Sequence, residues 1–197
     1  CLLSRGLGDV YKRQSKGDVD MKKLKGFCGL LLIMVIVLAQ TAYATTPTWE
    51  SLPGHHNQSI LLKNGELSAE DTVYNSARGV IMSAATLSIT NEQDGTLYIS
   101  ADVFAHKKID KAYQTVFLDK WDDDKNTWVQ VSYWEFEKTK EEEENGEMIS
   151  YHVGFIVSGC ELNRYYRARA MHLVQIGDDM EGKATETNGV LLTDHEV

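Results

Sequence analysis

The sequence is poor in cysteine and proline, and it has fewer basic than acidic residues. Its 197 residues include three Cys, two Pro, 20 Lys or Arg and 29 Asp or Glu, which gives a formal net charge of −9. So few cysteines exclude a disulfide-dense scaffold. The acidic balance argues against a nucleic-acid partner, because phosphate binding requires a concentrated cationic surface. The length limits the chain to one domain with flanking segments.

The sequence also lacks the local signatures of common enzyme classes. It has no Gly-x-Ser-x-Gly, no His-Glu-x-x-His, no Gly-rich phosphate loop and no paired cysteines, the patterns of serine hydrolases, zincins, nucleotide sites and zinc ribbons. Cys160 with His152 or His172 is a remaining combination for a thiol nucleophile and its base. Catalytic thiols require an open, electropositive setting, whereas Cys160 follows an apolar strand. The sequence therefore predicts no catalytic residue.

The first part of the chain does not look like a folded domain. Residues 1–20 do not begin with Met and have neither helical nor strand periodicity, so we expect them to be a non-native or untranslated leader. Residues 21–44 are predicted to be a signal peptide. In that segment a cationic stretch follows Met21, and residues 27–39 form an uncharged apolar run of the expected length.

Small side chains at the end of the apolar segment predict cleavage between Ala44 and Thr45. An uncleaved membrane anchor is the alternative, because residues 26–44 carry no charge and are nearly long enough to span ~30 Å of hydrocarbon. Cleavage would leave 13 basic and 26 acidic residues, a net charge of −13, with Cys160 as the only cysteine. The sequence thus predicts a secreted, acidic protein without an intramolecular disulfide.

Residues 78–197 have the pattern of an all-β domain, because apolar and polar residues alternate and turn residues separate the runs. Residues 45–77 contain both prolines and little periodicity, and we predict a linker there, with residues 60–62 as a candidate short strand. The expected strands are 80–82, 85–90, 96–104, 115–121, 127–137, 148–157, 163–175 and 184–193. Seven or eight such strands bury an adequate core only as a barrel or as two stacked sheets. We predict a two-sheet antiparallel β-sandwich.

Five short motifs follow one another along the predicted domain. They are Arg78-Gly79-Val80, Gly95 before Leu97-Tyr98-Ile99, Trp128-Val129-Gln130-Val131 with Trp134, Tyr165-Tyr166-Arg167-Ala168-Arg169, and Thr187-Asn188-Gly189-Val190. In this order they resemble a family of small exported proteins of Gram-positive bacteria classed as a domain of unknown function. The tyrosine-rich motif also looks like the penultimate strand of fibronectin type III domains, where a tyrosine packs at a sheet corner. The resemblance implies an immunoglobulin-like or fibronectin type III-like fold and an exported location, and it implies no activity.

Two groups of side chains are candidates for ligand binding. Trp121, Trp128 and Trp134 surround the hairpin predicted at 115–137, and they would either present flat aromatic faces to a carbohydrate or pack in the core. Arg167 and Arg169 project to the same face of their strand. They would either bind an anion or a carboxylate polymer, or pair with Asp or Glu of a neighbouring strand at ~0.2–1 kcal/mol per pair.

The hairpin turn resembles the beginning of a calcium loop. Asp122, Asp124 and Asn126 stand at alternating positions, but Thr127 occupies the sixth position, where Gly is needed, and Tyr133 the twelfth, where a bidentate Glu is needed. A solvated turn and a looser calcium site are the two interpretations.

These features predict a secreted, non-catalytic binding or structural module at or beyond the cell surface, with a cell-surface protein or a polysaccharide as its partner. The alternatives are an extracellular adhesion component, a calcium-stabilised carbohydrate-binding module, and a small extracellular hydrolase whose site is assembled from distant loops.

Overall fold

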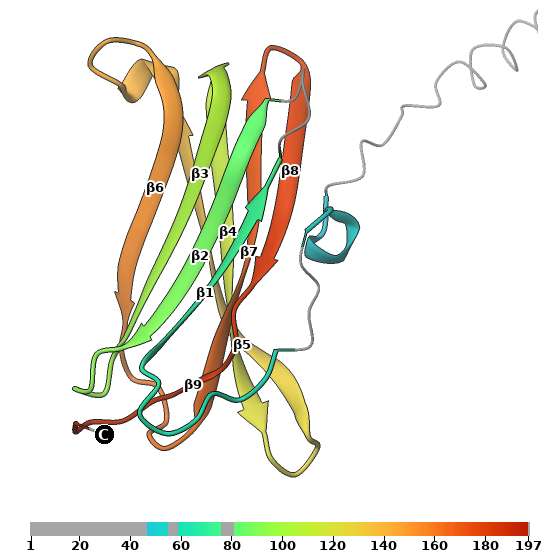
Figure 1. Ribbon diagram of the computed structural model, residues 1–197. Coiled ribbons are helices and arrows are strands. Elements are labelled where there is room, and N and C mark those ends of the chain that lie inside the picture. Colours follow the sequence, from blue (N-terminus) through green and yellow to red (C-terminus); the bar gives the residue numbers. More distant parts are fainter. Residues whose placement is uncertain (1–46, 55–58, 76–80, 197) are drawn as a thin grey trace, which may run out of the picture. The chain divides into compact units, whose positions relative to one another are not determined.

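Two antiparallel β-sheets face each other in the computed structural model, which describes residues 47–54, 59–75 and 81–196 (Figure 1). The strands are β1 (Ser68–Tyr74), β2 (Met82–Asn91), β3 (Leu97–Ile109), β4 (Lys111–Asp122), β5 (Thr127–Thr139), β6 (Met148–Val157), β7 (Tyr165–Ile176), β8 (Asp179–Glu186) and β9 (Val190–Leu191), and two short 3-10 turns are η1 (Trp49–Ser51) and η2 (Lys140–Glu142). The described residues contain no α-helix. The predicted β-sandwich is confirmed.

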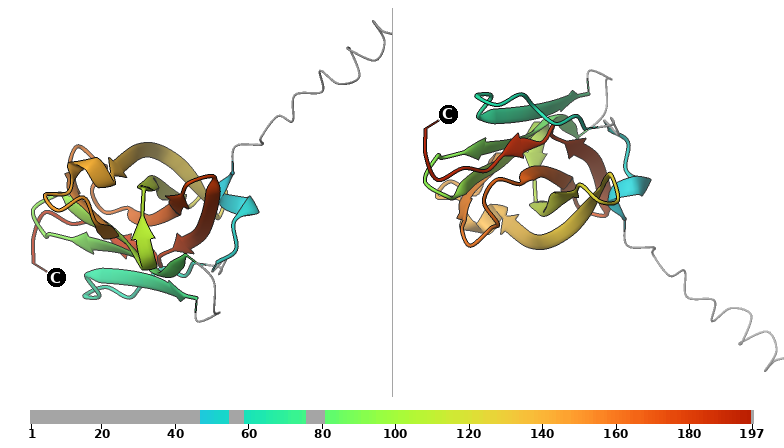
Figure 2. Two further views of the ribbon diagram at one scale, coloured as in Figure 1. Left: turned by 90° about the horizontal axis from the view of Figure 1, so that it is seen from above. Right: turned by 90° about the horizontal axis from the view of Figure 1, so that it is seen from below.

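The strand order places four strands at the edges of the two sheets. One sheet has the order β1-β2-β3-β6 and the other β5-β4-β7-β8, with the short β9 beside β7. The chain crosses between the sheets after β3, after β5 and after β6, and the two layers are seen end on in Figure 2. On one side of the sandwich, the β1–β8 side, the Glu186 amide donates to Asp71 Oδ2 at 2.9 Å. On the other, the β5–β6 side, the Trp134 and Phe155 rings meet at 4.9 Å.

Alternating side chains of each strand fill the space between the sheets. On β3, Leu97, Ile99, Ala101 and Val103 are fully buried, as the alternation of this segment predicts. Burying a side chain of this kind contributes about 1.5–3 kcal/mol for the larger ones. Cys160 is a free thiol, so this packing stabilises the described domain without a disulfide.

One polar group crosses the core and joins the two sheets. Gln114 Nε2 donates to the carbonyls of Ala101, at 2.8 Å, and Tyr151, at 3.0 Å, on the facing sheet. His172 Nδ1 lies 2.7 Å from Gln114 Oε1, and its Nε2 lies 2.8 Å from Thr185 Oγ1. Complete burial lowers the pKa of His172 to about 3, because a charged imidazole would lose its hydration there. The ring is therefore neutral at physiological pH, and one tautomer satisfies both partners.

The folded unit begins before residue 78, where the sequence pattern placed its start. Strand β1 pairs with β2 along its whole length. Gly54 and Leu61 form single parallel bridges with Ala184 and Gly189, respectively. Single bridges require no alternation of side chains, which is why the pattern of residues 45–77 resembled a linker.

The C-terminal part also differs from the expected single strand at 184–193. Strand β8 begins at Asp179, directly after a turn in which Gly177 has a φ of 56°, and it ends at Glu186. The two-residue β9 follows separately. The first half of β8 is an exposed edge, so it needs no apolar alternation and its sequence does not resemble a strand.

The expected leader, residues 1–20, the expected signal peptide, residues 21–44, and the expected cleavage site at Ala44 and Thr45 lie outside the described residues. Within the described ranges, no helix has the length and hydrophobicity needed to cross a bilayer. Export of the chain stays a prediction.

Candidate functional site

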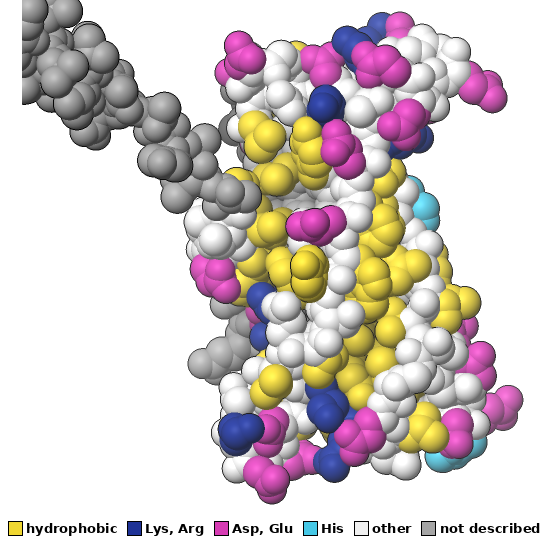
Figure 3. All heavy atoms as spheres, turned by 180° about the vertical axis from the view of Figure 1, so that it is seen from behind, with side chains coloured by type: hydrophobic (Ala, Val, Ile, Leu, Met, Phe, Trp, Pro, Cys, Tyr) yellow, Lys and Arg dark blue, Asp and Glu magenta, His cyan; other side chains and the backbone are white. Residues whose placement is uncertain are grey.

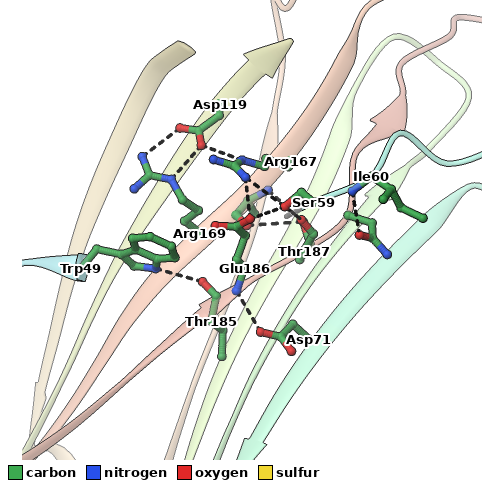
Figure 4. A network of polar contacts seen from close by, with 12 residues as sticks. Trp49, Ser59, Ile60, Asp71, Asp119, Arg167, Arg169, Thr185, Glu186 and Thr187 are labelled. Carbon is green, nitrogen blue, oxygen red and sulfur yellow. Dashed lines mark hydrogen bonds and ion pairs between the residues drawn. The ribbon is translucent and has the colours of Figure 1, made fainter. Parts of the chain in front are cut away.

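Four charged side chains form a cluster on the outer face of the five-stranded sheet (Figure 4). Asp119 on β4 stands opposite Arg167 on β7, and Arg169 on β7 stands opposite Glu186 on β8. The side chains of Asp119 and Glu186 are only 2% and 4% exposed, and those of the two arginines 13% and 12%. We call these four residues the ion cluster. Its members are nearly removed from water although they project from the outside of a sheet.

The charges of the ion cluster balance within it. Arg169 binds Asp119 through two bonds, from Nε to Oδ2 at 2.7 Å and from Nη2 to Oδ1 at 3.0 Å. Arg167 donates from Nε to the same Oδ2 at 2.9 Å and from Nη1 to Glu186 Oε1 at 2.5 Å. Two-pronged bonds of this kind are directional as well as strong. The arginines thus pair with carboxylates of neighbouring strands, and a ligand-binding role for them stays a prediction.

The N-terminal segment, residues 47–54 and 59–62, covers the ion cluster. Ser59 Oγ accepts a bond from Arg167 Nη1 at 3.0 Å and also contacts Glu186. Trp49 Nε1 donates to the Thr185 carbonyl at 3.1 Å. These contacts hold the segment against β7 and β8, which explains how outward-facing charges become buried.

Aromatic rings complete the enclosure of the two arginines. The guanidinium of Arg169 lies 5.0 Å from the ring centroids of both Trp49 and Phe117. The guanidinium of Arg167 lies 4.8 Å from the ring centroid of Trp128. Cation–π contacts of this kind contribute about 0.5–2 kcal/mol, so the cluster also fixes the Trp128 ring.

Trp128 in turn positions Trp121, which lines an open pocket at the end of the β4–β5 hairpin. The two indoles meet edge to face, with centroids 5.2 Å apart. Gly189 lies beneath Trp128, and a Cβ there would come within 2.5 Å of the indole ring. The pocket has a volume of about 410 Å³ and is lined by Lys120, Trp121, Asp122, Asp123, Asp124, Val129, Val131 and Arg164. We call it the hairpin pocket.

Charges of both signs line the hairpin pocket and are largely paired. Arg164 bonds Asp123 at 2.7 Å and Glu161 at 2.9 Å, and Lys120 bonds Glu161 at 2.9 Å. The hydrogen bond from Lys120 is the main cause of a lowered pKa of Glu161. The pocket therefore combines an aromatic surface with a polar rim that has no large excess of free charge.

The residues proposed as calcium ligands hold the hairpin turn together. Asp122 accepts hydrogen bonds from the Lys125 ammonium at 2.8 Å and from the amides of Asp124 and Lys125 at 3.1 and 3.0 Å. The bond from Lys125 is the main cause of a lowered pKa of Asp122. Asn126 takes the left-handed conformation, with a φ of 51°. No group of three or more His, Cys, Asp or Glu in the described part of the chain is arranged to hold a metal ion. Calcium binding stays a prediction.

The other predicted site residues lie apart from the hairpin pocket. Trp134 packs against Phe155 at the β5–β6 side, so the structure brings Trp121 and Trp128 together but not the third tryptophan. His152 Nδ1 bonds Asp102 at 2.8 Å, His172 is engaged within the core, and burial raises the pKa of the Cys160 thiol.

Sequence reasoning missed Trp49, Phe117, Asp119 and Glu186. Trp49, Phe117 and Arg169 line a second pocket of about 330 Å³ beneath the N-terminal segment. Asp119 and Arg167 are separated by 48 positions in the chain, and only the register of β4 with β7 brings them together. An acidic residue within an apolar strand pattern is the one local signal that could have identified Asp119.

A family model described as a family of unknown function, DUF6147, matches residues 55–190. This is more than half of the chain, so the chain belongs to that family. No curated protein matches the sequence. The resemblance to a family of unknown function is confirmed, and the matched range includes all four residues of the ion cluster.

Proposed function

We propose that this member of the DUF6147 family is an exported, non-catalytic β-sandwich module that binds a partner at or beyond the cell surface through the hairpin pocket. The observation that carries the proposal is the fixed position of Trp121. Its ring lies in an open pocket and is held by Trp128, which is itself held by Arg167 of the ion cluster. A binding aromatic that is already fixed loses little conformational entropy when a ligand arrives.

Pairing of the polar groups favours binding over catalysis. A general acid or base needs a proton-transferring group that faces the substrate. In the hairpin pocket, Arg164, Lys120 and Asp122 are engaged in ion pairs, and the nearby cluster carboxylates are buried behind arginines. These groups are suited to hold a shape and to present hydrogen-bond partners.

The finer fold assignment that we propose is fibronectin type III-like. Tyr166 lies near the start of β7, and its hydroxyl donates to the Glu161 carbonyl at 3.1 Å and accepts from the Glu161 amide at 2.9 Å. A tyrosine that bonds the backbone a few residues upstream is a feature of immunoglobulin-like sandwiches at this corner. The motif resemblance and the signal-like residues 21–44 support an exported protein of Gram-positive bacteria.

A polysaccharide suits the hairpin pocket better than a charged small ligand. Uncharged sugars offer apolar faces that stack on an indole and hydroxyls that bond to carboxylates and ammonium groups, and they do not require a free charge in the pocket. A cell-surface protein is the second class of partner, because exposed Val129 and Val131 extend the pocket with apolar surface.

The test is binding of the mature chain, residues 45–197, to purified cell-wall sacculi of a Gram-positive bacterium, with and without their attached polysaccharide. We expect Trp121→Ala to weaken binding at least tenfold, because an anchoring aromatic typically contributes about 2 kcal/mol or more. Tyr74→Ala is the matched control, since Tyr74 is an aromatic residue that is 78% exposed on β1.

Equal binding of the two variants, or no binding to either preparation, would contradict the proposal. Release of soluble fragments from the sacculi would instead favour the hydrolase alternative. Repeating the melting curve with calcium and with a chelator tests the calcium-stabilised alternative, which predicts a higher melting temperature with the metal.

A further inference from the structure

The four edge strands of the sandwich differ in how they discourage pairing with another chain. Edge strands present unpaired amides and carbonyls, and proteins usually protect them with charges, proline, short length or a cover. β1 has seven residues and includes Glu70 and Asp71. β8 carries several charges, and the N-terminal segment contacts it at Ala184. β5 carries charges near its end and has an irregular register with β4 between Leu118 and Asp119.

β6 is neither short nor charged, and it contains no proline; its register with β3 is irregular between Phe104 and Ile109, at the end near Met148. Its ten residues, Met148–Val157, include no Asp, Glu, Lys, Arg or Pro. Its partner in the sheet is β3, and no strand within residues 47–54, 59–75 and 81–196 pairs with its other side. Ile149 and Ile156 are 58% and 65% exposed. An exposed and uncharged strand of this length is an open template for a further strand.

The surface beside β6 carries apolar side chains that an added strand can contact, together with one ion pair, His152 of β6 with Asp102 of β3 at 2.8 Å. Tyr98 extends over Gly154, where a Cβ would come within 3.2 Å of Tyr98 Cζ, so the glycine permits the ring to lie across β6. Phe104, which is 45% exposed, stands opposite Ser150 on the same outer face. On the inner side, Trp134 and Phe155 form the seam between β5 and β6. The face seen in Figure 3 also carries a long band of hydrophobic side chains.

We propose that the free edge of β6 is a strand-addition site for an extended segment of a partner protein that is uncharged over the strand and basic at one end. The charge requirement comes from residues 140–147, which directly precede β6 and include five Glu and one Lys. That Lys140 is already paired with Asp110 at 2.7 Å. Two of the five Glu are paired as well, Glu143 with Lys138 at 2.6 Å and Glu147 with Lys108. The loop therefore leaves a smaller negative charge, that of Glu141, Glu142 and Glu144, at one end of an uncharged edge.

Charge also distinguishes this occupant from a second copy of the chain. The mature chain has a net charge of −13, so pairing two copies would bring two acidic bodies together. In an antiparallel pair of copies, each acidic loop would lie beside the uncharged end of the other β6, at Val157 and Ser158. A basic segment gains an attraction at the loop that a second copy does not offer, and this attraction acts within the ~8 Å Debye length of physiological salt.

We expect an antiparallel addition, because all pairs among the described strands are antiparallel and the two parallel pairings are single bridges. In an antiparallel addition, the C-terminal end of the partner segment lies beside Met148, where β6 begins. The basic residues of the partner therefore follow its uncharged stretch, and each second side chain of that stretch packs beside Ile156 and Phe104.

Two synthetic peptides test the proposal with the mature chain. Both have ten alternating Thr and Val residues, and one ends in Lys-Arg-Lys whereas the other ends in Glu-Glu-Glu. We expect the basic peptide to bind and to slow hydrogen exchange of β6 amides, and the acidic peptide to bind at least tenfold more weakly. The double substitution of Glu141 and Glu144 by Gln should remove most of this difference and its dependence on salt.

Substitutions test whether the peptide binds at β6 and whether a second copy of the chain binds there instead. Ile156→Lys adds a charge to the exposed row of β6 and should weaken the basic peptide about tenfold or more, whereas Tyr74→Lys on the opposite edge of the same sheet should not. No binding of the basic peptide, or binding that Ile156→Lys leaves unchanged, overturns the proposal. Self-association that Ile156→Lys abolishes also overturns it, because the occupant would then be a second copy. Trp121→Ala, which tests the hairpin pocket, should leave peptide binding unchanged.

Discussion

The two sides of the sandwich are closed by different kinds of contact. On the β1–β8 side, polar bonds cross between the sheets: Asp71 accepts from the Glu186 amide, and Glu181 accepts from Asn75 at 2.8 Å and from the Ile81 amide at 2.5 Å. On the β5–β6 side, Phe155 packs against Trp134 and Phe136, with ring centroids 4.9 and 5.3 Å away.

The two kinds of contact differ in how strictly they fix the geometry of the neighbouring residues. Hydrogen bonds and ion pairs require one geometry, and they continue from the β1–β8 side through the ion cluster to Trp128 and the hairpin pocket. Aromatic packing tolerates small shifts because dispersion is not directional. The hydrogen-bonded β1–β8 side is therefore suited to support a preformed pocket. The β5–β6 side, which is closed by aromatic packing, is suited to an edge strand that accepts a further strand.

The largest expected effect is that of breaking the ion cluster. Asp119→Ala leaves Arg167 and Arg169 buried without their shared carboxylate, and we expect the free energy of unfolding to fall by about 3–5 kcal/mol. Asp123→Ala is the control, because Asp123 is 62% exposed and an exposed ion pair contributes about 0–1 kcal/mol. Urea unfolding of both variants measures the difference. A decrease in the free energy of unfolding below about 1 kcal/mol for Asp119→Ala would mean that the ion cluster does not stabilise the fold.

Acid should lower the free energy of unfolding through His172, which bonds Thr185 of β8 and so belongs to the hydrogen-bonded β1–β8 side. Its folded pKa of about 3 lies below the ordinary value of 6.5, so between these values the unfolded chain binds the proton and the folded chain does not. Stability from this group is complete above pH 6.5 and is lost as the pH falls toward 3. The loss is about 1.4 kcal/mol per pH unit, or about 3 kcal/mol at pH 4.5.

Comparison of His172→Gln with the wild type isolates this contribution from those of the carboxylates that titrate in the same range. The variant should lose about 3 kcal/mol less than the wild type between pH 6.5 and 4.5, as measured by urea unfolding at each pH. Parallel slopes for wild type and His172→Gln would contradict a neutral buried histidine.

The smallest expected effect is that of a substitution on the β5–β6 side. Phe155→Ala should lower the free energy of unfolding by about 2 kcal/mol, less than the 3–5 kcal/mol of a fully buried Phe, because Phe155 is only partly buried. Ile156→Ala, one position further and exposed, should change it by less than about 0.5 kcal/mol. Melting curves in low and high salt measure both. A loss as large as that of Asp119→Ala would show that the two sides do not differ.

Short-range patterns predicted much of the fold. Alternation in residues 96–104 identified β3, and the polar turn between the two aromatic runs identified the β4–β5 hairpin. Both features can be read from neighbouring residues, because successive side chains of a strand point to opposite faces of the sheet and only one face enters the core. Strand β1 and the bridge at Gly54 were not predicted, because their pairing depends on distant strands rather than on their own sequence. The candidate strand at 60–62 is reduced to a single bridge at Leu61.

The candidate site was predicted only in fragments. Trp121, Trp128, Arg167 and Arg169 were identified from residue type and spacing, and the structure joins them through contacts that the sequence pattern does not contain. Asp119 and Trp49 were missed, because nothing local indicates that one will bind Arg169 and the other will cover it.

The sequence by itself determined that this chain builds an acidic all-β domain, because side-chain alternation and charge content are properties of neighbouring residues and of simple counts. Tertiary structure alone decided which outward-facing charges become buried, which tryptophan reaches a pocket and which strand keeps a free edge. These outcomes depend on strand register and on the order of strands in a sheet, and both are set by contacts between residues dozens of positions apart.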